Sequence, residues 1–256
     1  MPTIKKESFG KLKDGREATL YTLRNNKGNE IKVTDFGARL VSWRFRNLDF
    51  ENKFILIGHK TAGEYETDDR DLGVVYVDGT SHLADKIWSA SEGVEGVTFS
   101  IEDGGKKIAV TYSVSNDNEL SIKYAASGGV EDVSTKVVFS GDALTAPDFK
   151  IFSEDFKSLD DEMWKIIDKP AEVEMELGMF GFDIGCPIDY LDAGLKNTAD
   201  IFSAADKLLV NMYATQDNVH VNKLPDGFAI KTSGSKKTDD GEIKSQTVYV
   251  VKNRKG

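Results

Sequence analysis

The stretch Glu17–Leu23, EATLYTL, alternates polar and apolar residues and is followed by a turn and a second alternating run. The turn is NNKGN at residues 25–29, rich in the asparagine and glycine that favour hairpin turns. The second run is EIKVT at residues 30–34. Because successive side chains of a β-strand point to opposite faces, this period of two predicts two half-buried strands. The stretch therefore predicts an antiparallel β-hairpin.

The same period of two recurs along most of the chain. Further strands are predicted at residues 39–46, 54–57, 74–77, 97–101, 107–114, 120–125, 135–139, 171–177, 207–213, 218–224, 228–232 and 246–251. A helix is expected only near Ser158–Asp168, where SLDDEMWKIID begins with a serine that can cap a helix and has an acidic first turn. The pattern predicts an all-β fold with little helix, a large antiparallel β-sandwich, in one domain over residues 1–256.

Composition excludes several classes of protein. The formal net charge is −10 and no concentrated basic face is visible, so nucleic acid is not an expected partner. One cysteine, Cys186, leaves no disulfide framework and fits a reducing compartment. The first residues, MPTIKKESFG, lack the apolar region of a signal peptide, and no apolar run is long enough to span a membrane. We expect a cytoplasmic protein that does not bind membranes.

The sequence predicts no metal site and no cofactor. His59, His82 and His220 are the only histidines, no pair of them has the spacing of metal ligands, and Cys186 has no local partner. No phosphate-binding loop, dinucleotide fingerprint or nucleophile elbow occurs.

Several stretches, in the same order along the chain, resemble signature segments of galactose mutarotases (aldose 1-epimerases). They are VTDFGARLVS (33–42), similar to VTNYGGRIVSL; VTYSVSNDNEL (110–120), similar to vtYtLtddneL; GFAIKT (227–232), similar to GfaLEtQ; and QTVY (246–249), similar to TvYkF. Within the first, Gly37 is expected to adopt a positive φ at the corner between two strands. The chain is identified as a divergent member of this family. The resemblance implies the family's large sandwich, or supersandwich, with a carbohydrate site across a concave sheet face.

Mutarotation needs two groups that handle protons. A base removes the proton of the C1 hydroxyl while an acid protonates the ring oxygen, and the steps reverse after rotation about C1–C2. In the family the base is the Glu of GfaLEtQ and the acid is a His in TNHsYFNL. By the resemblance, Lys231 stands at the position of the base and Val137 at the position of the acid. Valine cannot transfer a proton, and lysine at its usual pKa is a poor base. We therefore expect that both usual catalytic residues are replaced.

The stretch LGVVYVDGTSHLADKIW (72–88) stands where the family has GaliGRyANRI and HLHGG…GFDKxxW. Two registers compete, and both place His82 near the sugar, so His82 is the candidate catalytic residue; an exposed loop histidine is the alternative interpretation. Lys231, Asp78, Asp85 and Asp192 are the candidate substrate-binding residues. For Lys231 the alternative is a solvent-facing strand residue.

Two functions stay open for this sequence. One is an isomerase of the aldose 1-epimerase type that acts on a hexose or related sugar in carbohydrate metabolism. The alternative is a non-catalytic carbohydrate-binding or regulatory module, with a phosphorylated or anionic sugar as one choice of ligand because Lys231 suits an anion. In both cases the expected partner is a small-molecule sugar. A role in protein association alone has no specific sequence feature in its favour.

Overall fold

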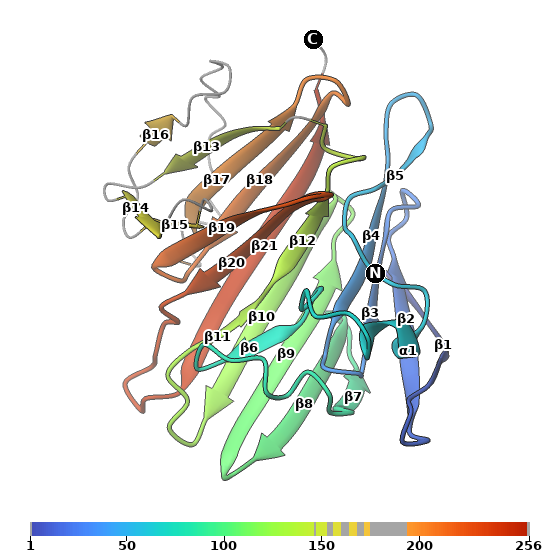
Figure 1. Cartoon of the computed structure of the whole chain (residues 1–256), viewed down its shortest axis with the longest axis vertical. Helices are drawn as coiled ribbons and strands as arrows, with labels where there is room; N and C mark the ends of the chain where they lie inside the picture. The colour runs from blue at the N-terminus through green and yellow to red at the C-terminus, as the bar shows by residue number, and fades with distance from the viewer. Residues whose placement is uncertain are drawn as a thin grey trace.

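The computed structural model describes residues 2–145, 147–152, 156–159, 164–167, 172–174 and 194–254. These residues form antiparallel sheets (Figure 1). The N-terminal sheet is five-stranded and follows the order of the chain: β1 (Thr3–Lys11), β2 (Glu17–Arg24), β3 (Glu30–Thr34), β4 (Leu40–Arg46) and β5 (Asn52–Phe54). The predicted hairpin is present as β2 and β3, closed by the Asn25 amide, which donates to the Asn29 carbonyl at 2.9 Å.

A nine-stranded sheet forms the middle of the molecule, and the blue N-terminal strands lie to its right in Figure 1. Its order is β16 (Glu172–Glu174), β13 (Asp148–Phe152), β17 (Lys196–Ser203), β18 (Leu208–Ala214), β21 (Ile243–Asn253), β10 (Glu119–Ser127), β9 (Lys106–Val114), β8 (Val97–Asp103) and β7 (Ser89–Glu92). The C-terminal strand β21 thus pairs with both β18 and β10. Residues distant in sequence are brought together in this way.

A second five-stranded sheet carries most residues of the candidate functional site. Its order is β12 (Val137–Ser140), β20 (Gly227–Ser233), β19 (Asn218–Leu224), β15 (Trp164–Ile167) and β14 (Phe156–Leu159). Beside it, β6 (Val75–Val77) pairs with β11 (Val133–Thr135). An isolated bridge between Leu56 and Phe139 links the N-terminal sheet to β12. One short helix, α1 (Ala62–Tyr65), follows a turn in which the Thr61 amide donates to the Glu64 carboxylate at 2.9 Å.

The main core lies between the nine-stranded sheet and the two five-stranded sheets. Trp43 of β4, Tyr112 of β9 and Ile230 of β20 all belong to it and are fully buried. Alternating strand residues of each sheet meet there, as a sandwich requires, and removal of their apolar surface from water is the main source of stability. A second apolar cluster, which includes Phe9, Tyr65 and Ala229, lies on the opposite face of the five-stranded sheets, under α1.

The corner after β3 shows why a glycine is needed there. Gly37 has φ of 67°, as the sequence predicts, and a β-carbon on it would lie 2.6 Å from the carbonyl oxygen of Ala84. A side chain would therefore push apart the β3–β4 corner and the 84–88 loop.

The structure corrects parts of the sequence prediction. The helix predicted near Ser158–Asp168 is wrong where the structure describes that stretch, because β14 and β15 pair antiparallel there and β15 also pairs with β19. Residues 160–163 and 168 lie outside the described residues. Pairing with neighbouring strands overrides the local helical signal. The strand predicted at 54–57 overlaps β5 only at Phe54, and β1, β7, β13 and β17 were not predicted. Among the described residues, no helix is long and apolar enough to cross a membrane. The single domain over residues 1–256 stays a prediction.

Candidate functional site

Three basic side chains lie in one row on the face of the β12–β20–β19 sheet that points away from the main core. Ile230 and Val137 are paired neighbours and both point into that core. Because side chains alternate along a strand, Lys231 and Lys136 point to the opposite face. Continuing the register of β12 and β20 by one residue sets Lys136 opposite Lys231, and His220 is the partner of Lys231 on β19. We call Lys136, Lys231 and His220 the basic row.

The basic row borders a small cavity. Lys136, His220 and Lys231 line it together with Tyr76 and Ala229, and its volume is about 30 Å³. The ammonium nitrogen of Lys231 lies 4.4 Å from the centre of the Tyr76 ring, within the range of a cation–π contact. The cavity therefore has cationic groups on one side and an aromatic face on another.

Tyr76 is held by a carboxylate beside the cavity. Its hydroxyl donates to Oδ2 of Asp71 at 2.7 Å, and the Ser81 hydroxyl donates to the same oxygen at 3.0 Å. Burial, followed by the hydrogen bond to Asp71 and the charge of that residue, raises the pKa of Tyr76 above its ordinary value. Tyr76 is thus a neutral hydrogen-bond donor at physiological pH.

A second network supports Lys136. Its ammonium donates to the backbone carbonyl of Arg70 at 2.6 Å. The Arg70 side chain pairs with Asp68 at 2.7 Å and with Asp226, in the β19–β20 turn, at 2.9 Å. Hydrogen bonding by Arg70 is the main reason that the pKa of Asp68 lies well below its usual range. Asp68 also contacts Nε2 of His59 at 2.6 Å, so this network fixes the 59–71 loop against the β12–β20 sheet.

Arg39 lies buried beneath the same loops. Its guanidinium donates to the carbonyls of Leu72 at 3.3 Å and Ala84 at 3.2 Å, and it lies over the rings of Phe36 and Tyr65. Burial lowers the pKa of Arg39 from its ordinary value. Its two carbonyl contacts connect the segments that border the site.

Burial also changes the titration of the two lysines. Burial lowers the pKa of both Lys231 and Lys136. The positive charge of Lys231 lowers the pKa of Lys136 further. Hydrogen-bond donors dominate this face, so it is suited to hydroxyl and anionic oxygens.

The predicted site residues are not all in one place. Lys231 lies in the basic row. His82 is exposed, with Nδ1 2.7 Å from the Thr80 hydroxyl and Nε2 3.6 Å from Asp103, and it does not line the cavity. Its role as a catalytic residue stays a prediction, as do the roles of the other candidates.

The three predicted aspartates have different surroundings. Asp78 accepts from Lys106 at 2.6 Å and from the amides of Glu131 and Asp132, so its carboxylate holds the β6 end against neighbouring loops. Asp85 is exposed and lies 3.5 Å from Lys86. Asp192 lies outside the described residues.

Sequence reasoning missed Lys136, Tyr76 and Asp71. It placed Val137 at the acid position, whereas Val137 points into the main core and the neighbouring Lys136 faces the cavity. The period of two gave a usable signal, because Lys136 and Val138 share one face of β12. No local sequence pattern predicts a role for Asp71, which lies in the loop before β6 and accepts the hydrogen bond of the Tyr76 hydroxyl. In the described part of the chain, no cluster of three or more histidine, cysteine or acidic side chains could hold a metal.

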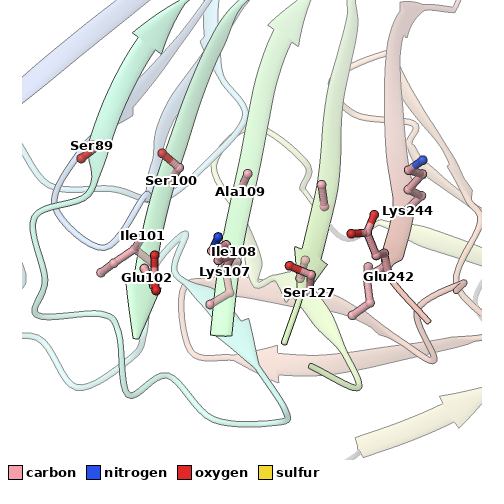
Figure 2. Close-up of a pocket in the computed structure, with 13 residues that line it drawn as sticks. Ser89, Ser100, Ile101, Glu102, Lys107, Ile108, Ala109, Ser127, Glu242 and Lys244 are labelled. Carbon is pink, nitrogen blue, oxygen red and sulfur yellow. The ribbon is translucent and has the colours of Figure 1, made fainter. Parts of the chain in front are cut away.

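A shallow groove of about 570 Å³ runs across the outer face of the nine-stranded sheet (Figure 2). Short side chains in register form its floor, with charged side chains beside them: Ser89, Ser100, Ala109 and Ala125 on the floor, and Glu102, Lys107, Glu242 and Lys244 beside it. Alternation along β8, β9 and β10 directs these residues away from the main core. The groove is therefore on the face opposite to the packed core.

Comparison with known proteins identifies the fold. No family model and no curated protein matches the sequence. Among solved structures, a GalM/aldose epimerase homologue from C. elegans matches over 100% of both chains, with a TM-score of 0.67 and 15% identity. Galactose 1-epimerase from Lactobacillus acidophilus NCFM also matches over 100% of both chains, with a TM-score of 0.65 and 13% identity. At this identity the likeness shows the fold, and the chain has the β-sandwich fold of these aldose epimerase-like proteins.

Proposed function

We propose that this chain binds a sugar on the cavity-bearing face of the β12–β20–β19 sheet, as a relative of aldose 1-epimerases without their usual acid–base pair. The observation that carries the proposal is the position of the Lys231 side chain at the cavity. Lys231 stands where the family resemblance puts a catalytic glutamate, and its ammonium borders a cavity together with Tyr76, Lys136 and His220. The position faces the site, but its chemistry has changed from proton acceptor to hydrogen-bond donor.

Binding without fast turnover follows from the groups around the cavity. Mutarotation requires a base at the C1 hydroxyl and an acid at the ring oxygen. The two lysines are donors when charged, and the Oδ2 atom of Asp71 already accepts from Tyr76 and Ser81. His82, the sequence candidate for catalysis, points towards Asp103 instead of the cavity. These contacts favour a binding module over an isomerase.

The place of action belongs to the same proposal. One cysteine in 256 residues fits a reducing compartment, and we place the protein in the cytoplasm as a single domain.

Two NMR measurements on one sample test the proposed function. Saturation-transfer difference with glucose and galactose reports binding, and exchange between the α and β anomer signals reports turnover. We expect saturation transfer to the sugar protons and an anomer exchange rate equal to that of buffer alone. Saturation transfer should weaken in Lys231→Met and persist in Lys123→Met. Lys123 is the control because it lies on the nine-stranded sheet, where it pairs with Glu95, and does not line the cavity. Exchange well above the buffer rate would show an active epimerase instead.

A further inference from the structure

Lys136 and Lys231 differ from other half-buried lysines of this acidic protein in their surroundings. The half-buried Lys53, Lys106 and Lys196 lie against carboxylates at 2.6–3.2 Å, with Asp206, Asp78 and Asp217 as their partners. Within the described ranges, neither Lys136 nor Lys231 forms an ion pair with a carboxylate. Lys136 donates to a backbone carbonyl, and Lys231 lies over an aromatic ring.

Placing these two lysines side by side is costly in the free protein. Cationic side chains directly opposite on neighbouring strands repel one another. Both are also half-buried, and a buried charge without a directly paired counter-ion raises the free energy of the folded state. An anion bound between them would offset both costs.

Nearby carboxylates are engaged by other groups. Asp71 accepts from Tyr76 and Ser81, and Asp68 accepts from Arg70. Asp132 accepts from the amide and hydroxyl of Ser235. The charges of Asp71 and Asp68 act on Lys136, and that of Asp132 acts on Lys231, but among the described residues none of these aspartates forms a direct ion pair with either lysine. The pKa of both lysines stays lowered, so these aspartates offset the cost of burying the two charges only in part.

We propose that the basic row is an oxyanion subsite and that the sugar bound on this face carries a phosphate or carboxylate group. The inference rests on the proposed function and names the class of its ligand. Two ammonium groups from adjacent strands give several donors, and His220 on the third strand adds a charge when it is protonated. Tyr76 orients Lys231 across the cavity.

The size of the cavity suits the anionic group of the ligand and not its sugar ring. About 30 Å³ accommodates one or two water-sized atoms. It therefore receives oxygen atoms of the anionic group, and the sugar ring lies outside it on the same face.

Isothermal titration calorimetry with four probes tests the proposal: glucose, glucose 6-phosphate, glucuronate and inorganic phosphate. We expect the wild type to bind glucose 6-phosphate or glucuronate about tenfold or more tighter than glucose, the gain typical of one charge-assisted contact. The stronger of these two ligands distinguishes phosphate from carboxylate recognition. Inorganic phosphate should compete with the phosphorylated sugar, because both place an anionic group in the basic row.

Variants locate the effect. Lys136→Met and Lys231→Met keep the apolar stems and should each bring the affinity for the anionic sugar close to that for glucose, while Lys123→Met should bind like the wild type. Unfolding midpoints near that of the wild type confirm that the variants are folded. Equal affinity for glucose and its charged relatives, unchanged in both variants, would overturn the oxyanion subsite and leave sugar binding intact. Failure of every probe to bind would overturn the proposed function as well.

Discussion

The ammonium group of Lys231 lies over the ring of Tyr76 at the cavity, with its nitrogen 4.4 Å from the ring centre. The two residues come from β20 and β6, which belong to different sheets. The same tyrosine donates through its hydroxyl to Asp71. The carboxylate of Asp71 thus positions the Tyr76 ring, and the ring positions the Lys231 ammonium group that we propose binds the ligand.

Replacing Tyr76 separates these two contributions. Tyr76→Leu removes the ring, so Lys231 loses its orientation, and we expect binding of glucose 6-phosphate to weaken about threefold or more. Tyr76→Phe keeps the ring and loses only the bond to Asp71, which retains the Ser81 hydroxyl as donor. Calorimetric titration should therefore show a smaller loss for Tyr76→Phe. An equal loss in both variants would indicate that the hydroxyl, and not the ring, supports the site.

The free energy of unfolding should rise with pH because of Lys136 and Lys231. Burial lowers the folded-state pKa of Lys136 and Lys231 below their ordinary 10.5. Between the lowered pKa and 10.5 the unfolded chain binds more protons than the folded chain, so the free energy of unfolding increases with pH. Urea unfolding across this window should show the wild type gaining stability relative to the Lys136→Met/Lys231→Met double variant. A difference that stays constant, or falls, would contradict the burial of these charges.

Arg39 should matter for stability more than for ligand contact. Arg39→Met leaves the carbonyls of Leu72 and Ala84 without their donor, and we expect a loss of about 3 kcal/mol in the free energy of unfolding. The lysine of Arg39→Lys reaches only one of the two carbonyls, so its free energy of unfolding should lie between those of the wild type and Arg39→Met. Urea unfolding of the three proteins measures this order. Equal stability of all three would show that the guanidinium does not connect the two loops.

Gly37 offers a matched comparison of backbone strain with close contact. Gly79 has a similar positive φ of 78°, but a β-carbon there meets no neighbouring atom. Gly79→Ala should cost about 1 kcal/mol from φ alone. Gly37→Ala adds the contact with the Ala84 carbonyl and should cost about 3 kcal/mol. Thermal or urea unfolding compares them, and similar losses would mean that the loop moves away easily.

His82 tests the competing interpretation of the site. Its side chain is 44% exposed and does not line the cavity. We expect His82→Gln to change stability by less than about 0.5 kcal/mol and to leave sugar binding as in the wild type. Saturation-transfer NMR and urea unfolding measure both quantities. A large loss of sugar binding in this variant would return His82 to the centre of the site.

The sandwich could be predicted from the sequence, whereas the contacts around Lys231 could not, for physical reasons. Alternation of side chains is a local property, and the strand predicted at 218–224 coincides with β19. The polarity of Lys231 also follows from alternation. Which residues meet Lys231 depends on pairing between distant strands, which brings Tyr76 from β6 and Lys136 from the junction of β11 and β12 to the same cavity. The strand β15 was mistaken for part of a helix because its pairing with β19 is likewise non-local.

The central claim is that Lys231 provides positive charge for an anionic sugar on this face. The most direct test is calorimetric titration of glucose and glucose 6-phosphate into the wild type and Lys231→Glu. We predict that the wild type prefers glucose 6-phosphate by about tenfold or more, and that the charge reversal in Lys231→Glu abolishes this preference or inverts it in favour of glucose. An unchanged preference for glucose 6-phosphate in a folded Lys231→Glu protein would contradict the account.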